Sequence, residues 1–496
     1  MIDLLYASPM AVMIVGAFTL MLLSQNKISL SKFNIISIIF LVISLALQLY
    51  IFNDKPDSEY LFESAFGKTF IIDKFSKTFD LMFTIGSILT LLINMDYFKS
   101  RKYFNGEYFA ILLFSVFGMM LLSHSNELIS SFISLEIASL SIYTLVGYHK
   151  NKKTSSEAMM KYLILGSLAG AIFMLGVSLI YAAVGSTLFN DITHYVHTTN
   201  IDDMGIIFVG ASLIMITVMF KIGAVPFHSW VIDVYQGAPA PITMYMASTF
   251  KISVFALILR LYLVNFASIH DFWIEMLQII TIATLIGGSL LAISQQNIKR
   301  MLAASSIVHT GYMLIALSSI GLGAELAAPS LMFYLIAYFI SAVGAFGIIS
   351  FLSSQEESDF TYDDFKGFAD RRPYMALFMS IFMLSLAGFP STIGFLGKFY
   401  IFTSSIQSGQ ILLTALGILT AFISVYYYFK LIAVMYFYST DEQKRTLTID
   451  MSTILIFVMA VFVIWGGIGT NLISVVPGAD GLINIAEDAI QSLKTY

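Results

Sequence analysis

The chain contains no cysteine and few charged residues. Each of these two features excludes certain kinds of site or classes of protein. Without cysteine it can form no disulfide, no thiolate zinc site and no cysteine-ligated iron–sulfur cluster. Charged residues make up 11% and hydrophobic residues 58% of the 496 positions, against roughly 25% and 45 to 50% in soluble domains. A formal net charge of -5 provides no basic surface for nucleic-acid phosphates, so no nucleic-acid partner is expected. The composition predicts an integral membrane protein.

Apolar runs of about 20 residues, the length that crosses a bilayer, recur along the whole chain. With turn residues as boundaries, they predict an all-α fold, a polytopic membrane helix bundle of about 14 transmembrane helices. The predicted helices lie near 8–24, 33–52, 78–96, 107–124, 127–147, 158–184, 205–232, 239–265, 272–295, 301–320, 328–353, 374–405, 409–438 and 451–474.

Basic residues gather in the loops that follow odd-numbered spans. These loops hold Lys27, Lys32, Lys99, Arg101, Lys102, Lys150, Lys152, Lys153, Lys299, Arg300, Lys366, Arg371, Arg372, Lys444 and Arg445. The loops after even-numbered spans hold only Lys55, Lys68, Lys74 and Lys77. Because cytoplasmic loops are enriched in Lys and Arg, this asymmetry places the N terminus outside the cytoplasm, and the even span count places the C terminus outside too.

Two predicted spans are interrupted by proline and glycine, the seventh at 221–226 and the twelfth at 387–394. Proline removes a backbone donor and breaks the helix, and the freed groups must face protein or a hydrated cavity rather than lipid. The breaks are five spans apart, so the two helices run in opposite directions. This pattern predicts inverted five-helix repeats, spans 4–8 and 9–13. The expected regions are 1–106 for helices 1–3, 107–270 and 271–440 for the repeats, and 441–496 for helix 14 and an amphipathic tail.

Several ionisable side chains lie inside predicted spans, where burying a charge costs about 2.5 to 3.5 kcal/mol on insertion scales. Glu136, Lys221, Lys251 and Lys398 are the main candidates, with Lys221 and Lys398 near the breaks. Buried lysine suits proton transfer because burial disfavours its charged form and a nearby carboxylate restores it. The alternative is that each charge only pairs with a neighbour to hold helices together.

Other ionisable residues are secondary candidates. His309 lies midway along the tenth span, where it can relay protons or simply bond a neighbouring helix. His228 follows the first break, where it can belong to a proton path or cap the broken helix. Lys161 and Arg260 lie near span ends, where long side chains can snorkel to the surface, and of these only Lys161 is kept as an accessory site. Gly166 and Gly170 form a Gly-x-x-x-Gly pair that favours close helix packing.

Four motifs carry a family resemblance. They are Phe220-Lys221-Ile222-Gly223-Ala224-Val225-Pro226-Phe227-His228, Asp233-Val234-Tyr235-Gln236-Gly237-Ala238-Pro239, Asn297-Ile298-Lys299-Arg300-Met301-Leu302-Ala303, and Ala387-Gly388-Phe389-Pro390 continuing to Gly397-Lys398-Phe399. Together they resemble the antiporter-like membrane subunits of respiratory complex I (NADH-quinone oxidoreductase). The Asp-Val-Tyr-x-Gly-Ala-Pro form is closer to the N subunits than to their L or M relatives.

The resemblance implies a non-redox, proton-translocating subunit of a quinone-reducing enzyme in a bacterial inner membrane. It implies an interacting pair in Glu136 and Lys221, a central carrier in Lys251 and a distal lysine in Lys398, with Lys161 and His309 as accessory relays. It also implies that quinone, FMN and iron–sulfur clusters are bound by other subunits and none by this one, and that M-like and K-like subunits are its neighbours. A subunit of a multisubunit cation/proton antiporter and a non-transporting scaffold are the alternatives.

Overall fold

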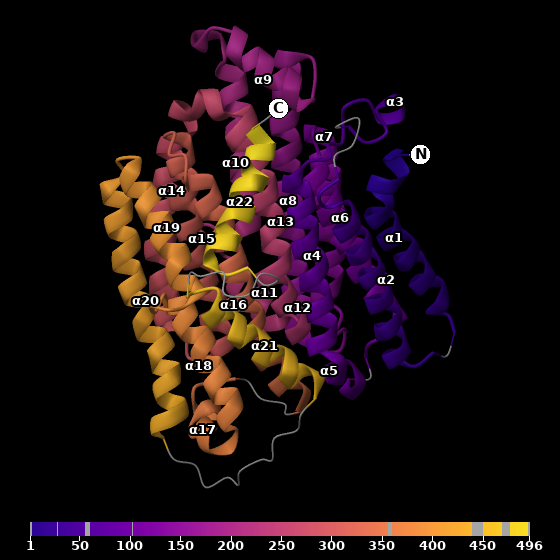
Figure 1. The fold of residues 1–496 in the computed structure, drawn as a ribbon, viewed down its shortest axis with the longest axis vertical. Helices are drawn as coiled ribbons and strands as arrows, with labels where there is room; N and C mark the ends of the chain where they lie inside the picture. Colours follow the sequence, from indigo (N-terminus) through magenta and orange to yellow (C-terminus); the bar gives the residue numbers. More distant parts are fainter. Residues whose placement is uncertain are drawn as a thin grey trace.

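The computed structural model describes residues 2–26, 28–54, 60–101, 103–355, 360–438, 450–468 and 477–494. Within them the fold is a helical bundle without β-strands (Figure 1). Five basic residues from the predicted charge asymmetry lie outside this part of the chain, namely Lys27, Lys55, Lys102, Lys444 and Arg445.

The predicted polytopic helical bundle is confirmed. Among the described residues, twelve helical segments are long and apolar enough to cross a membrane. They are α1 (Ile2–Leu23), α2 (Leu30–Ile51), α4 (Lys74–Ile93), α6 (Gly106–His124), α7 (Leu128–Val146), α8 (Lys153–Val184), α10 (Gly205–Ile222), the continuous run Ala240–Asn265, α14 (His270–Ser294), α15 (Ile298–Gly321), α16 (Ala327–Gln355) and α20 (Ile411–Phe437). The predicted twelfth span is the interrupted pair α18 (Pro373–Ala387) and α19 (Ile393–Gln407), and α21 (Met451–Trp465) is the last.

The run Ala240–Asn265 is built from α12 (Ala240–Tyr245), a π-helical turn at Met246–Phe250, α13 (Lys251–Arg260) and a second π-helical turn at Leu261–Asn265. Short helices join the spans: α3 (Glu63–Phe66), α5 (Met95–Ser100), α9 (Phe189–Thr198), α11 (Val231–Gly237) and α17 (Phe368–Arg371). The amphipathic C-terminal helix α22 (Ala479–Lys494) packs its apolar face on α4 and α16.

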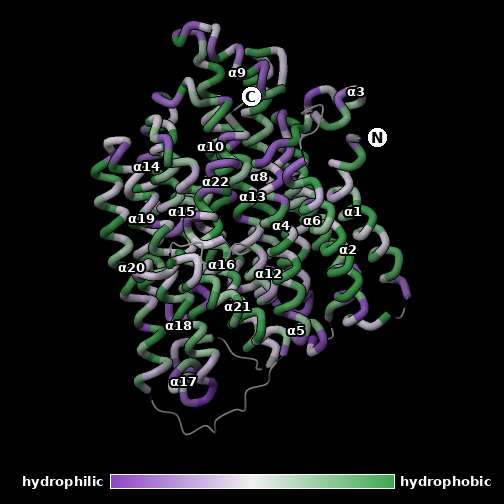
Figure 2. The backbone as a smooth tube through the Cα atoms, in the orientation of Figure 1, coloured by the Kyte–Doolittle hydropathy of each residue, from purple (hydrophilic) through white to green (hydrophobic). Residues whose placement is uncertain are grey.

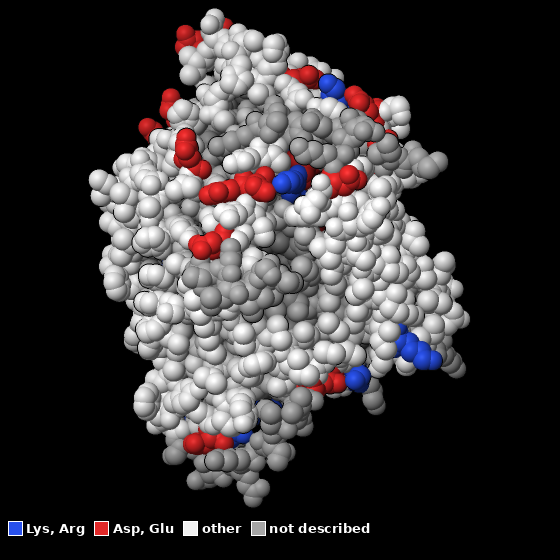
Figure 3. Space-filling model, in the orientation of Figure 1, with Lys and Arg blue, Asp and Glu red and all other residues white. Residues whose placement is uncertain are grey.

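Polar residues concentrate at the two ends of the bundle. Figure 1 shows α3, α9 and both termini at one end and α5 and α17 at the other. Hydrophobic residues dominate the helices between these ends (Figure 2), and on the face drawn in Figure 3 a wide band of the surface carries no charged side chain. This is the distribution that a bilayer requires of a spanning bundle.

The bundle has a protein-enclosed centre and a periphery that faces outward. In an apolar 18-residue stretch of each span, Ala240–Asn265 and α15 are 100% buried, whereas α1, α2, α8 and α20 are between 33% and 39% buried. Ionisable side chains on the central helices are therefore shielded from lipid. The candidate site is assembled around them.

Candidate functional site

The first broken helix ends immediately after Lys221 and Ile222. α10 ends at Ile222, and Gly223 follows with φ +74°, a conformation that L side chains rarely adopt. A Cβ at Gly223 would also lie only 2.6 Å from Val231 Cγ2. The backbone then passes through Pro226 before α11 begins at Val231. Lys221 is therefore the second-last residue of α10. The carbonyl groups at the end of a helix have no partners within the helix and need partners elsewhere.

Lys221 is fully enclosed by side chains of α7. Its Nζ donates to Ser139 Oγ at 2.8 Å and to Tyr143 OH at 2.9 Å, and lies 3.4 Å from Glu136 Oε1. The Lys221 side chain is 0% exposed and that of Glu136 is 18% exposed. The structure therefore brings the predicted pair together, with two hydroxyl groups bound more closely to the ammonium than the carboxylate is.

Gly166 and Gly170 of α8 make room for these partners. A Cβ on Gly166 would lie 2.0 Å from Tyr143 OH, and one on Gly170 would lie 3.3 Å from Glu136 Oε1. The Gly-x-x-x-Gly pair does allow close packing, as its spacing indicates. The side chains it admits, however, are the ones that surround Lys221.

Lys251 is buried without an acidic partner. It follows the π-helical turn Met246–Phe250, and its Nζ donates to the carbonyl oxygen of Ser306 at 2.9 Å and to Thr310 Oγ1 at 3.1 Å. The ring of Tyr338 lies 5.7 Å from Nζ, within range of a cation–π contact. In the described part of the chain, no carboxylate forms an ion pair with Lys251.

Thr310 connects Lys251 to the broken end of α10. Its Oγ1 also lies 3.1 Å from the carbonyl oxygen of Ile222 and 3.0 Å from that of Ser306. A hydroxyl group has one proton, so it can donate to only one of these carbonyls at a time while it accepts from Lys251. One side chain on α15 therefore joins the residue that follows Lys221 to Lys251.

His309 continues the polar centre toward the second broken helix. Its Nδ1 lies 2.6 Å from Tyr334 OH and its Nε2 lies 3.0 Å from Tyr428 OH. A phenol can donate or accept, so either imidazole tautomer is compatible with these bonds. The His309 ring also lies 5.0 Å from the ring of Tyr338 and 5.7 Å from that of Tyr312, between centroids.

Lys398 caps the second broken helix. α18 ends at Ala387 and is followed by Gly388 with φ +87°. Lys398 Nζ donates to the carbonyl oxygen of Leu386 at 2.8 Å and to that of Ala387 at 2.9 Å, and lies 4.9 Å from the ring of Tyr312. The terminal carbonyl groups of a helix carry a partial negative charge, which favours a cation at this position.

The structure does not place Lys161 and His228 among these residues. The Lys161 side chain is 43% exposed and forms ion pairs with Glu157 at 2.7 Å and Asp233 at 3.0 Å. Burial opposes ionisation of Asp233, but hydrogen bonds and charges from Lys161 and Arg300 outweigh it and lower the pKa of Asp233 below its usual value. His228 is half-buried in the segment between α10 and α11. Among the described residues, its ring makes no hydrogen bond to the central set.

The expectation that Arg260 snorkels to the surface is wrong. Its side chain is 4% exposed, and Nη1 lies 3.0 Å from Asp73 Oδ2. A π-helical turn and a further segment continue the span beyond Arg260, which keeps the guanidinium inside the bundle. A second enclosed pair, His124 and Asp80 at 2.9 Å, joins α6 to α4 nearby.

The central arrangement can hold and pass protons. Hydrogen bonds join Glu136 to Lys221, and ring contacts through Tyr338, His309 and Tyr312 lead from Lys251 to Lys398. Between the two groups, Thr310 binds Lys251 and the backbone carbonyl that follows Lys221. In the part of the chain described, no three His, Cys, Asp or Glu side chains converge as metal ligands.

Comparison with known proteins identifies chains of the same kind. Residues 125–424 match the family described as NADH:quinone oxidoreductase/Mrp antiporter, transmembrane. NADH-quinone oxidoreductase subunit N of Trichlorobacter lovleyi is 37% identical over 380 residues, 77% of each chain. Subunit N 1 of Solibacter usitatus is 36% identical over 480 residues, 96% of this chain and 95% of that one. A chain of respiratory complex I from Thermus thermophilus superposes with a TM-score of 0.78 and 27% identity, covering 94% of this chain and 98% of that one.

Proposed function

Because the chain belongs to the family of NADH:quinone oxidoreductase and Mrp antiporter membrane subunits, and to its subunit N branch, we propose that it translocates protons within a redox-driven pump. The proposed proton carriers are Glu136, Lys221, Lys251 and Lys398, with His309 as a relay. The subunit performs no electron transfer itself. Quinone reduction, with its FMN and iron–sulfur clusters, is assigned to other subunits of the complex.

The observation that carries this proposal is the bridge from Lys221 to Lys251. Lys221 is followed by Ile222, whose carbonyl oxygen lies 3.1 Å from Thr310 Oγ1, and Thr310 accepts from Lys251 Nζ at 3.1 Å. The Lys251 amine and the backbone carbonyl next to Lys221 therefore share one hydroxyl group, while the Lys221 amine itself bonds to side chains of α7. A set of charges that only fastened helices together would need no such connection.

The three lysines differ in what stabilises their charge. Lys221 has the carboxylate of Glu136 and Lys398 has the carbonyl end of α18. Among the described residues, Lys251 has neutral oxygen atoms and the ring of Tyr338. Burial disfavours an ammonium ion most strongly where the opposite charge is weakest. We therefore assign Lys251 as the site that a proton occupies in transit, and the two outer lysines as sites that hold a proton until their partner moves.

Separation of Glu136 from Lys221 is the proposed release step. While the carboxylate is near, it favours the protonated amine. When it withdraws, the proton can leave Lys221 toward Lys251 by way of water at the break in α10, where freed backbone groups can be hydrated. Lys221 Nζ lies 3.4 Å from Glu136 and is bound more closely by the hydroxyl groups of Ser139 and Tyr143. These two hydroxyl groups can therefore hold the amine when the carboxylate moves.

The proposed direction is from the cytoplasm to the periplasm of a bacterial inner membrane, with both termini on the periplasmic side. The concentration of Lys and Arg in loops after odd-numbered spans supports this orientation. M-like and K-like membrane subunits are the proposed neighbours.

Replacement of Lys221 tests the assignment. In the complex reconstituted into vesicles, Lys221→Ala is expected to abolish proton pumping coupled to quinone reduction while the complex still assembles. Lys366→Ala, on an exposed loop with an ion pair to Asp363, is the control. Normal pumping by the Lys221 variant would refute the assigned role.

The family also contains subunits of Mrp antiporters. A chain with that function would exchange sodium for protons without quinone chemistry. Purification in mild detergent distinguishes the two functions, because quinone-reducing, iron–sulfur partners indicate the pump, whereas only small membrane subunits indicate the antiporter.

A further inference from the structure

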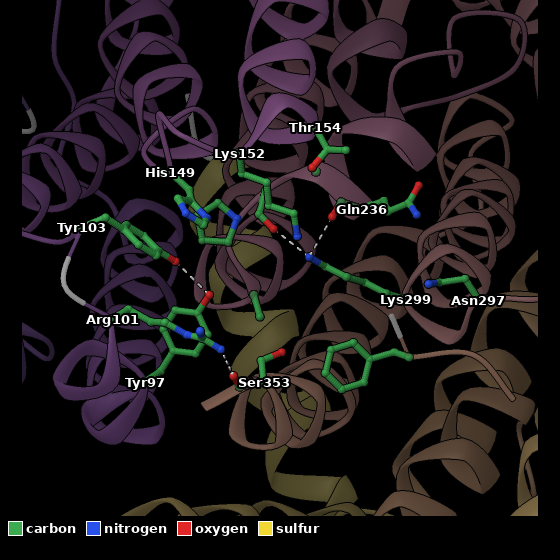
Figure 4. Close-up of a pocket in the computed structure, with 15 residues that line it drawn as sticks. Tyr97, Arg101, Tyr103, His149, Lys152, Thr154, Gln236, Asn297, Lys299 and Ser353 are labelled. Carbon is green, nitrogen blue, oxygen red and sulfur yellow. Dashed lines mark hydrogen bonds between the residues drawn. The ribbon is translucent and has the colours of Figure 1, made fainter. Parts of the chain in front are cut away.

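A cavity of about 520 Å³ lies at the end of the bundle that carries the basic loops. It is formed where α5, the loop between α7 and α8, the loop between α11 and α12, and the ends of α15 and α16 meet (Figure 4). Its volume is within the range of about 300 to 1,000 Å³ typical of small-molecule sites. It is separate from the lysine axis, and none of Glu136, Lys221, Lys251 or Lys398 lines it.

The walls of this cavity carry positive charge from three separate elements. Arg101 follows α5, Lys152 precedes the first residue of α8, and Lys299 lies in the first turn of α15. His149 adds a fourth nitrogen-bearing group and stacks on Tyr103, with ring centroids 4.0 Å apart. None of the described residues that line the cavity is acidic.

Lys299 is the most enclosed of these cations. The residue is only 7% exposed, and its Nζ donates to the carbonyl oxygens of Ala238 at 2.7 Å and Gln236 at 3.3 Å. Both acceptors are neutral, and among the described residues no carboxylate pairs with this ammonium. Buried charges in proteins are normally paired with an opposite charge.

Lys152 brings a second ammonium toward the first. Figure 4 shows the side chains of Lys152 and Lys299 directed toward one another at the cavity. Among the described residues, neither lysine forms an ion pair with a carboxylate. Two like charges facing each other favour an anion between them.

The donors of the cavity are of the kind that bind phosphate oxygens. Arg101 donates from Nη2 to the carbonyl oxygen of Ser353 at 2.8 Å, which fixes the orientation of a guanidinium that has five N–H donors. Arginine and lysine are the side chains that bind phosphate oxygens most strongly. The start of α8, a 32-residue helix, also lies at the cavity with Thr154, and the positive end of its dipole adds to the same field.

We propose that this cavity is a binding site for a phosphate-bearing anion, taken either from solution or as the headgroup of a phospholipid. Lys152, Lys299 and Arg101 supply the charge, and the aromatic side chains of Tyr97, Tyr103 and Phe360 form its less polar walls. The bound anion compensates the charge of Lys299 and removes the repulsion between the two ammonium groups. This proposal can be tested independently of proton transfer, because binding of the anion to the cavity is measured directly.

The test uses the purified, delipidated complex that contains the full chain, with two probes. The first is radiolabelled orthophosphate in equilibrium dialysis, and the second is native mass spectrometry after incubation with vesicles that contain phosphatidylglycerol. Lys152→Gln is the principal variant because its side chain is exposed and its loss leaves the buried contacts intact. Lys153→Gln is the matched control, since Lys153 is the next residue, is also exposed and does not line the cavity.

Orthophosphate binding that Lys152→Gln weakens about tenfold and Lys153→Gln leaves unchanged supports a site for phosphate from solution. A phospholipid adduct that Lys152→Gln removes, without orthophosphate binding, supports a headgroup site. Arg101→Gln is expected to give the same loss for either probe. Absence of binding for both probes, or binding that neither variant changes, would overturn the proposal.

Discussion

Lys398 Nζ donates to the carbonyl oxygen of Ala387 at 2.9 Å, across the break between α18 and α19. The lysine of the second half-helix thereby satisfies the end of the first. Lys221 has the opposite arrangement, because it lies on the first half of its own broken helix and finds its charge partner, Glu136, on α7. The two broken helices therefore hold their lysines by different means, and their variants should differ.

Removal of Lys398 should cost stability as well as pumping. Lys398→Ala leaves the carbonyl groups of Leu386 and Ala387 without their donor, at a cost of about 1 to 3 kcal/mol for a buried unsatisfied group. The measurement is the thermal midpoint of the purified complex, beside that of Lys366→Ala, whose exposed ion pair contributes little to stability. Equal midpoints for the two variants would show that Lys398 does not support the broken helix.

Glu136→Gln should uncouple the subunit with little change in fold. The amide keeps the size and the oxygen of the carboxylate, and Lys221 retains its bonds to Ser139 and Tyr143. What is lost is the negative charge that favours the protonated amine. We expect proton pumping to fall at least about tenfold, an effect of the size that one lost charge-assisted contact produces. Pumping by reconstituted vesicles at wild-type levels would contradict the proposed release step.

Thr310→Val tests the bridge between the lysines. Valine has the shape of threonine but no hydroxyl group. The substitution therefore removes the hydroxyl group that lies between the carbonyl oxygen of Ile222 and Lys251 Nζ. Thr281→Val is the matched control, because Thr281 is equally buried and bonds only to the carbonyl oxygen of Leu277 in its own helix. Pumping per quinone reduced should fall in the first variant alone. A similar decline in both variants would indicate a general packing defect.

Lys161→Gln should retain most of the pumping. The side chain lies at the surface in ion pairs with Glu157 and Asp233, and exposed ion pairs contribute little to stability. Proton transport and the thermal midpoint should both stay near wild-type values. A loss as large as that of Lys221→Ala would assign Lys161 a role in proton transfer that its position does not suggest.

The spans and the main candidate residues could be predicted from the sequence because each has a local signal. Apolar runs reveal the helices, the segments around Pro226 and Pro390 reveal the breaks, and a charge such as Lys251 is conspicuous in an apolar helix. That Glu136 pairs with Lys221 was implied by the family resemblance and not by the residues alone. The structure supplies its geometry.

The polar residues between the lysines had no such signal. Thr310, Tyr143 and Tyr428 are ordinary members of membrane helices, and they matter because helices distant in sequence bring them to Lys251, Lys221 and His309. A threonine hydroxyl often bonds to its own helix, as Thr310 also does, so its bond to another helix is invisible without coordinates.

For Arg260, the sequence suggested an exposed position, whereas the side chain is enclosed. Its position near the end of a predicted span suggested a snorkelling side chain, but Asp73 lies 3.0 Å away inside the bundle. These residues are 187 positions apart. Only the packing of α13 against α4 reveals the pair.

The central claim is that a proton crosses the bundle through Lys251. The direct measurement is the number of protons pumped per electron by the reconstituted complex with Lys251→Met, which keeps the length of the side chain and removes the titratable amine. The account predicts a lower ratio while electron transfer to an artificial acceptor continues at its normal rate. An unchanged ratio in a fully assembled complex would contradict it.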